Sequence, residues 1–233
     1  MKQILLAAII IGLLLSGCTI DGKININLNN PGTATESGNI SQNANEALFK
    51  LLPEKEGYTW IYNGFAEYGH QMTLEEIVTD NEKTTYIIKG KVFDMSDGES
   101  GMGEEHFSID LKYIIQNGSI IQVKKENIMM DSEMDRLELI RAPLVEGNKW
   151  TQVAADKKGN ERHLNSEITK VEELDGKKVY TVEYRDRDSD YYEIRTIEEG
   201  TGVVSFARLW NPDGEAFEIG YSLYREMSGY NKD

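Results

Sequence analysis

The sequence predicts a mainly β fold, an antiparallel meander built from two similar halves and preceded by a short helix. Apolar and polar residues alternate in segments of strand length, as they do when one face of a strand is buried. Asn117-Gly118 and Asp175-Gly176 separate such segments and are typical of two-residue hairpin turns. In addition, the phrase PEKEGYTW of residues 53–60 returns as PLVEGNKW in residues 143–150.

The repeated phrase follows the pattern P-x-x-E-G-x-x-W in both places. A proline cannot donate to a ladder and suits a position just outside a strand. The glycine permits a turn with positive φ, and the tryptophan provides a large apolar anchor. We interpret the phrase as the entry into the first strand of each half, about residues 50–128 and 140–210. Duplication and the recurrence of a useful motif explain it equally well. The predicted structural residues are Pro53, Gly57, Trp60, Pro143, Gly147 and Trp150.

The first half is expected to open with a helix and to continue with strands. Asn43 or Asn45 can cap a helix in which residues 46–52 place apolar groups at helical spacing, and Pro53 and Gly57 stop it. The predicted strands include residues 84–89, 107–115 and 120–123.

The second half repeats this order. Its predicted strands are residues 163–171, 178–184, 191–195, 203–209 and 216–224, with turns at 175–176 and 211–214. Residues 129–141 join the halves and fit either a helix or a strand. Because this join is not rich in Gly, Ser or Pro, we expect one packed body rather than two small domains.

The N-terminus has the features of an export signal. Lys2 precedes an apolar stretch, residues 4–15, which is shorter than the roughly 20 residues that a transmembrane helix needs. The stretch ends in Leu15-Ser16-Gly17-Cys18, which resembles the lipobox of bacterial lipoproteins. The resemblance implies that signal peptidase II recognises Leu15, Ser16 and Gly17 and removes residues 1–17, and that a diacylglycerol is attached to the Cys18 thiol.

Cys18 is the only cysteine in the 233 residues, so lipid attachment leaves neither a free thiol nor a disulfide. Residues 18–45 contain few large apolar groups and are expected to form a flexible tether. Residues 46–233 would then form the β-rich body. The expected location is the extracytoplasmic face of a bacterial cell membrane, with the lipid as the anchor.

The chain is strongly acidic, with a formal charge of −15. Nucleic acids and anionic lipid surfaces would repel it, so we expect no nucleic-acid partner, and membrane contact only through the lipid.

The sequence assigns no catalytic residue and no cofactor. Short His or Cys spacings typical of zinc, a G-x-S-x-G elbow and phosphate-binding fingerprints are all missing from it. The nearest approach to a metal site is Asp186, Asp188 and Asp190, which alternate as at the start of a calcium loop. The calcium pattern then fails, because Tyr191 and Ile197 stand where Gly and Glu are required.

The second copy of the phrase also resembles P-L-x-x-G-x-x-W, a pattern of uncharacterised secreted bacterial lipoproteins, through Pro143, Leu144, Gly147 and Trp150. That resemblance implies an antiparallel β domain, and some such proteins are similar in build to curved half-barrels. Our leading hypothesis is a non-enzymatic domain that binds an envelope protein or a small apolar ligand. The alternatives are a carrier of acyl chains or lipoproteins with an apolar cavity in an incomplete barrel, and an envelope hydrolase with converging carboxylates.

Overall fold

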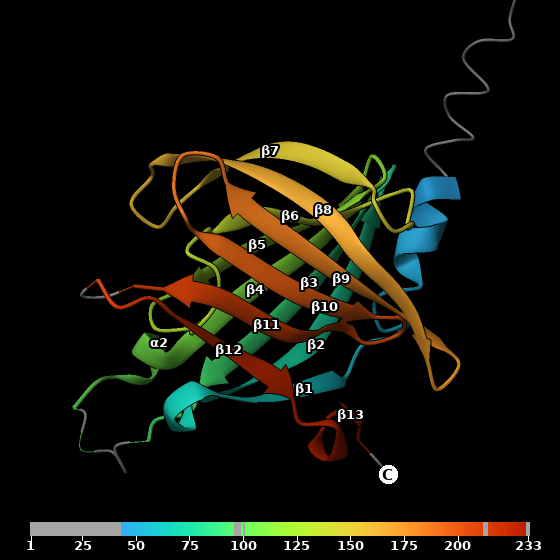
Figure 1. The fold of residues 1–233 in the computed structure, drawn as a ribbon. Coiled ribbons are helices and arrows are strands. Elements are labelled where there is room, and N and C mark those ends of the chain that lie inside the picture. Colours follow the sequence, from blue (N-terminus) through green and yellow to red (C-terminus); the bar gives the residue numbers. More distant parts are fainter. Residues whose placement is uncertain (1–42, 96–98, 100, 212–213, 232–233) are drawn as a thin grey trace, which may run out of the picture.

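A computed structural model describes residues 43–95, 99, 101–211 and 214–231. In this part of the chain one 13-stranded sheet curls into a nearly closed barrel (Figure 1). The elements are β1 (Tyr58–Gly64), η1 (Phe65–Glu67), β2 (Gly69–Asp80), β3 (Lys83–Val92), α2 (Glu104–Phe107), β4 (Ser108–Gln116), β5 (Ser119–Glu126), β6 (Arg136–Arg141), β7 (Lys149–Ala155), β8 (Glu161–Leu174), β9 (Lys177–Asp186), β10 (Tyr192–Glu198), β11 (Gly202–Trp210), β12 (Phe217–Leu223), η2 (Arg225–Met227) and β13 (Gly229–Tyr230).

The strand order is β6-β5-β4-β3-β2-β1-β12-β11-β10-β9-β8-β7, and all pairs are antiparallel. Each half is therefore a meander, and the last strand of the second half returns to pair with the first strand of the first half. The expected mainly β, antiparallel and curved fold is confirmed, and the join at residues 136–141 is strand β6 rather than a helix. The halves share one sheet.

The two copies of the repeated phrase occupy matching positions in the two meanders. Gly57 and Gly147 have φ values of 85° and 82°, in the left-handed region that favours glycine. The Gly57 amide donates to the Leu74 carbonyl oxygen and the Gly147 amide to that of Ile168, each at 2.8 Å. The strands that supply these acceptors, β2 and β8, both shift register directly after them, at Leu74/Glu76 and Ile168/Lys170.

The barrel has two different ends. The turns after β2, β4, β6, β8 and β10 lie at one end, where the helix of residues 43–49 also packs, and we call it the helix end. The loops after β1, β3, β5, β7, β9 and β11 lie at the other, the loop end, which includes η1 and α2 (Figure 1).

The helix of residues 43–49 covers the helix end. Leu48, Leu51 and Leu52 are buried there. The Asn45 side-chain oxygen accepts from the Gly118 amide at 2.9 Å, so Asn45 lies inside the helix and holds a turn of the barrel rather than capping the helix. Within the described residues this helix covers 43–49 and ends three residues before the predicted end. No helix in the described residues has the length and apolar character needed to span a bilayer.

Glycines allow the strands to curl. A Cβ on Gly220 in β12 would lie 2.0 Å from the Phe206 carbonyl oxygen, and one on Gly90 in β3 would lie 2.3 Å from that of Gln71. Both distances are far below contact, so only glycine lets the neighbouring strands approach in this way. Such kinks are how a sheet acquires the curvature that closure requires.

The seam between β6 and β7 is closed largely by side chains. One isolated bridge joins Met134 and Asp156. Further along, the Gln152 side chain accepts from the Glu138 amide at 2.8 Å and donates to the Glu138 carbonyl oxygen at 3.0 Å. Asn148 donates in the same way to the Arg141 carbonyl oxygen at 2.8 Å. The two strands are thus aligned, but side-chain amides replace most of the backbone ladder.

Candidate functional site

Charged side chains are buried among apolar ones inside the barrel at its loop end. The loop between β5 and β6, residues 127–135, bends into this end, and we call it the plug. Lys124 and Glu126 from β5, Asp131 from the plug, and Glu193 and Arg195 from β10 meet there with side-chain exposures of 1% or less. Burying charges in this way requires partners, because desolvation is costly.

Asp131 receives four partners from the barrel wall. Its Oδ1 accepts from Arg195 Nη2 at 2.9 Å and from the Tyr221 hydroxyl at 3.1 Å. Its Oδ2 accepts from Gln122 Nε2 at 3.2 Å and lies 3.6 Å from Lys124 Nζ. Burial alone would raise the pKa of Asp131, but the charges of Arg195 and Lys124 outweigh it and hold that pKa well below its usual range.

A second carboxylate, that of Glu193, joins the plug to β10. The Ser132 hydroxyl and the Tyr191 hydroxyl both donate to Glu193 Oε1, the latter at 2.6 Å. Lys124 Nζ donates to the Ser132 carbonyl oxygen at 2.6 Å and to Glu126 Oε1 at 3.1 Å. The plug backbone and side chains are therefore both held by wall residues.

The outer part of the plug is also bound by cations. Glu133 pairs with Arg208 from β11 at 3.2 Å and with Arg162 from β8 at 3.5 Å. Lys157 pairs with Glu126 at the base of the plug. Four cations from four strands thus pair with carboxylates of the plug: Lys124 from β5, Arg162 from β8, Arg195 from β10 and Arg208 from β11.

His70 lies beside this network in a cage of aromatic rings. It is fully buried and stacks on Tyr62 with ring centroids 4.5 Å apart, and it forms a T-shaped pair with Tyr221 at 4.8 Å. Neither of its ring nitrogens has a hydrogen-bond partner among the described residues. Burial disfavours the charged imidazolium and lowers the pKa of His70 to about 3.

Aromatic side chains are exposed at the same end of the barrel. Phe65 in η1, Trp210 at the end of β11 and Phe217 at the start of β12 form a trio in which Phe217 lies 5.8 Å from Phe65 and 5.0 Å from Trp210, between ring centroids. Their exposures are 46%, 37% and 38%. The backbone after Phe65 is left-handed at Ala66 and Glu67, which is unfavourable for residues other than glycine.

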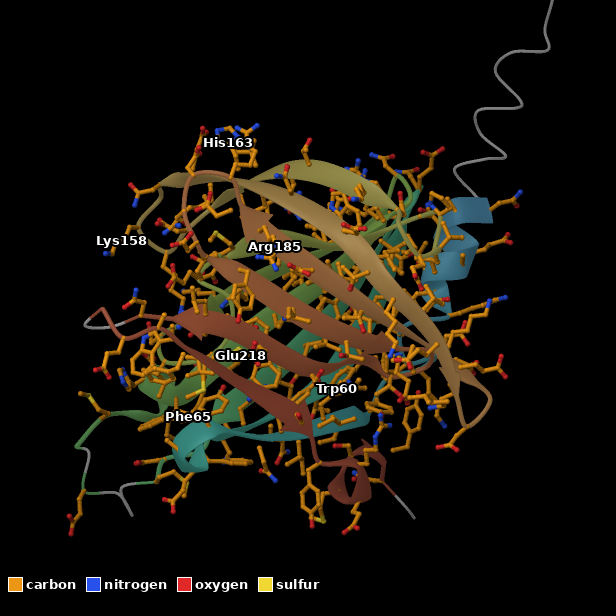
Figure 2. The ribbon with its side chains drawn as sticks, in the orientation of Figure 1. Trp60, Phe65, Lys158, His163, Arg185 and Glu218 are labelled. Atoms are coloured by element: carbon orange, nitrogen blue, oxygen red, sulfur yellow. The ribbon has the colours of Figure 1, made fainter. Side chains whose placement is uncertain are left out.

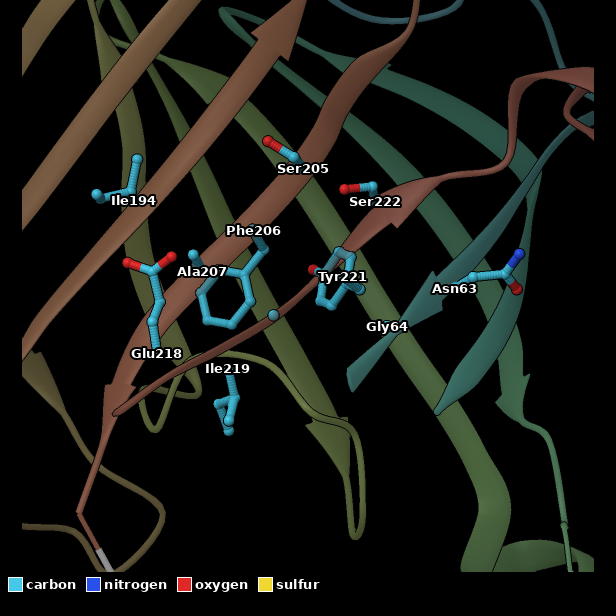
Figure 3. A pocket seen from close by; sticks show the side chains of 11 residues that line it. Asn63, Gly64, Ile194, Ser205, Phe206, Ala207, Glu218, Ile219, Tyr221 and Ser222 are labelled. Carbon is cyan, nitrogen blue, oxygen red and sulfur yellow. The ribbon is translucent and has the colours of Figure 1, made fainter. Parts of the chain in front are cut away.

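A groove of about 510 Å³ runs along the outer face beside the trio, across β1, β12, β11 and β10 (Figure 3). Ser205, Ala207, Gly220 and Ser222 give it small outward groups, with Asn63 at one side and Glu218 and Ile194 at the other. Glu218 accepts from the Tyr192 hydroxyl at 3.1 Å, and Figure 2 shows it on the same side of the barrel as Phe65. The loop end therefore combines an exposed aromatic trio with a groove that has the Glu218 carboxylate at one side.

The candidate calcium residues do not gather around one point. The Asp186 carboxylate is buried and accepts from Arg162 at 2.8 Å and from the Ser189 hydroxyl at 2.9 Å. Asp188 and Asp190 are exposed. Across the described ranges, no three His, Cys, Asp or Glu side chains are placed to share a metal ion.

The predicted structural tryptophans are both buried, but their indole groups differ. Trp60 Nε1 donates to the Thr201 carbonyl oxygen at 2.7 Å, whereas Trp150 Nε1 has no partner within the described part of the chain. Pro53 is buried and Pro143 is exposed. Leu15, Ser16, Gly17 and Cys18 lie outside the described residues.

Sequence reasoning missed the buried charges. A signal for them exists, because Lys124 is in phase with the buried Ile120 and Gln122, and Arg195 is in phase with the buried Ile197. A charged residue in the apolar phase of a strand must find a partner inside the fold. Asp131, which comes from a loop, has no such periodic signal.

No protein-family model matches this chain, and no curated protein matches its sequence at a significant level. Two solved structures are similar to it. One is described as a "putative lipoprotein" from Parabacteroides distasonis, with 16% sequence identity and a TM-score of 0.42. The other is a "putative exported protein with YmcC-like fold" from Bacteroides fragilis, with 13% identity and a TM-score of 0.43. Each comparison covers 74% of this chain and 96% of the other. A shared fold does not by itself give a function.

Proposed function

We propose that the protein is a lipid-anchored lipoprotein of a bacterial cell envelope, and that its barrel binds a ligand or an envelope protein at the loop end without catalysing a reaction. The lipobox residues Leu15-Ser16-Gly17-Cys18 support the anchor. The binding role rests on one observation, the exposed trio of Phe65, Trp210 and Phe217 at the end of the barrel opposite the helix of residues 43–49. Exposed aromatic clusters are typical of interaction sites.

The arrangement of the two ends supports this proposal. The chain enters the barrel from its N-terminus at the helix end, so an anchor at Cys18 would be attached through that end. The acidic body would be repelled by anionic lipid. The loop end can then face away from the membrane, toward a partner.

The barrel interior does not favour the two alternatives. A carrier of acyl chains needs an apolar cavity, but here Lys124, Arg195 and Asp131 fill the loop end of the interior. A hydrolase needs carboxylates in an open cleft, but Asp131 and Glu193 are fully buried and each is bonded to a cation or a hydroxyl.

Labelling with radioactive palmitate tests the anchor. The full chain, produced in a bacterium, should incorporate the label and sediment with membranes, and Cys18→Ala should lose both properties because the acylated thiol is gone. Equal labelling of the two proteins, or a wild-type protein that is released without lipid, would refute the anchored state.

Photo-crosslinking in intact cells tests the binding face. A photoreactive amino acid at position 217 should give a discrete adduct that disappears when Trp210→Ser is added. The matched control is the same group at Leu174, which is exposed at the helix end. Adducts of equal yield from both positions would mean that the loop end is not a specific site.

Native mass spectrometry separates this proposal from the carrier. The described fold lies entirely within residues 43–231, so the chain from Thr19 contains all of it. We expect this protein to have the mass of the polypeptide alone, since packed apolar side chains and the charged network at the loop end occupy the interior. A lipid that co-purifies and is lost on denaturation would support the carrier instead.

A further inference from the structure

The plug is a loop, yet two of its polar side chains, those of Asp131 and Ser132, are buried as deeply as the core. Asp131 and Ser132 have exposures of 2% and 0%. Loops usually run over the surface, where water satisfies their polar groups. The apolar contacts of the plug come from Met129 and Met134, and its other described anchors are hydrogen bonds and ion pairs.

Stability alone does not explain why the plug is held by buried ion pairs. A buried ion pair recovers at best the desolvation cost of its two charges, and apolar side chains of the same volume are often more stabilising. A barrel that only needed a closed end could use leucines there, as it does at its helix end with Leu48, Leu51 and Leu52. Closing the loop end with ion pairs instead points to a role in which the plug can leave and another charged group can take its place.

The side chains that hold the Asp131 carboxylate all belong to the wall. Arg195 comes from β10, Tyr221 from β12, and Gln122 and Lys124 from β5. We call these four side chains the anion seat. Arg195 Nε has no hydrogen-bond partner among the described residues, so the seat retains a buried donor beyond those that Asp131 uses.

The charge balance of the wall also fits an anion. The wall cations linked by these contacts are Lys124, Lys157, Arg162, Arg195 and Arg208, and the wall carboxylates they meet are Glu126, Asp156, Asp186 and Glu193. Counted over these nine linked residues alone, positive charges exceed negative ones by one when Asp131 and Glu133 of the plug are left out, although the whole chain has a charge of −15.

We propose that the plug is an internal occupant of an anion-binding site, and that a carboxylate or phosphate group of a ligand takes the place of Asp131 when the plug leaves the barrel. This inference deepens the proposed function and rests on it, because it gives the ligand at the loop end a chemical class. The bound anion would contact Arg195, Lys124, Gln122 and Tyr221.

A thiol placed in the plug measures how often it opens. The chain from Thr19 has no cysteine, so Met129→Cys introduces a single reactive group without touching the ionic contacts of Asp131. The control is Met72→Cys, which replaces another buried methionine in the wall strand β2. The reagent is 4,4′-dithiodipyridine, which is neutral and does not compete for the seat.

The rate at which each thiol reacts is measured in sodium acetate, in sodium phosphate and in sodium chloride at equal ionic strength. An anion that binds the open seat increases the open population, about tenfold at ten times its Kd, and the thiol at position 129 should react correspondingly faster. The thiol at position 72 should not respond. Acceleration by acetate alone, or by phosphate alone, identifies which group the seat accepts.

Two outcomes would overturn the proposal. Equal acceleration by chloride would show that salt merely screens the ion pairs. Identical, anion-independent rates at positions 129 and 72 would show that the plug opens only when the whole barrel unfolds. Palmitate labelling and crosslinking at position 217 do not depend on the plug, so either result would leave the proposed function standing.

Asp131→Ala provides an independent test, since it removes the internal occupant. Acetate should then raise the melting temperature of this variant in a saturable manner. Asp186→Ala is the control, because its partner Arg162 is partly exposed and retains Glu133 and Asp156. The same rise in both variants, or in neither, would contradict a specific anion seat.

Discussion

At the scale of single residues, His70 couples stability to pH. The unfolded chain takes up a proton at this residue below about pH 6.5, whereas the folded state, with the pKa lowered to about 3, does not. The unfolded state therefore binds more protons between pH 6.5 and 3, and the free energy of unfolding falls as the pH falls through that window. Across two pH units the loss amounts to about 3 kcal/mol.

We predict that His70→Phe removes most of this acid sensitivity. Phenylalanine keeps the ring between Tyr62 and Tyr221 and removes two nitrogens that have no described partner, so stability at pH 7 should be unchanged or higher. Urea unfolding at pH 7 and pH 4.5 should show that wild type loses about 3 kcal/mol more than the variant. Parallel losses would show that His70 is not the titrating group.

Asp131 and Asp110 form a matched pair for a second prediction, because each is bonded to a cation. Asp131→Ala should lower the free energy of unfolding by about 3–5 kcal/mol, since it removes the nearer of the two carboxylates that pair with the buried Arg195 and leaves Glu193 alone at 3.5 Å. Asp110→Ala should lower the free energy of unfolding by less than about 1 kcal/mol, since the pair of Asp110 with Lys89 is half-exposed. Denaturant titrations at pH 7 measure both, and similar values for the two variants would contradict the buried network.

The residues that the sequence could identify are those with local signals. Gly57 and Gly147 share a turn that their repeated phrase encodes, and Trp60 and Trp150 are buried as large apolar groups should be. Asp131 and Arg195 are 64 residues apart, and their pairing depends on how β5, β10 and β12 curl toward each other. No local pattern contains that information.

At the scale of elements, the seam between β6 and β7 is expected to be the weakest line of the sheet. The equivalent junction between β1 and β12 is a regular ladder in which Tyr62, Asn63 and Gly64 face Leu223, Ser222 and Tyr221. At the seam, the side chain of Gln152 provides the contacts to Glu138 instead.

We predict that Gln152→Ala destabilises the seam locally. Its two bonds to the Glu138 backbone are worth about 1–2 kcal/mol, so amide exchange at Glu138 should accelerate about tenfold. Exchange at the β1–β12 junction should not change, and Thr151→Ala, at an exposed neighbouring position, serves as the control variant. Uniform acceleration across both junctions would indicate global loss of stability rather than a weak seam.

Strands β4 and β9 were predictable because their buried and exposed residues alternate within a short segment. The β4–β5 hairpin was predictable because its turn residues also lie next to each other in the sequence. The alternative between helix and strand for residues 129–141 could not be resolved, because part of that segment is neither. Residues 127–135 form the plug, and their conformation is set by partners on distant strands.

At the scale of the whole molecule, the halves depend on each other. Trp60 in the first half donates to Thr201 in the second, and Tyr62 donates to Val203 at 2.7 Å. Tyr184 in the second half donates in return to Leu139. Buried tyrosine and indole groups would lose these acceptors if the halves were separated, which is costly.

We therefore predict that neither residues 43–141 nor residues 142–231 fold alone. Each fragment should give a poorly dispersed NMR spectrum, and mixing the two during refolding should restore the dispersion of the intact barrel. A monomeric fragment with a well-dispersed spectrum would show that one meander is a domain in its own right.

The position of the helix of residues 43–49 has a mechanical consequence. Asn45 is bonded to the turn at Gly118 in the first half, and the Lys50 carbonyl oxygen accepts from the Gly200 amide in the second. Tension that arrives along the chain from the N-terminus is therefore divided between two hairpins before it reaches any strand. We therefore expect a pulling force applied at the N-terminus to load both hairpins together, rather than to detach the strands of the sheet one after another.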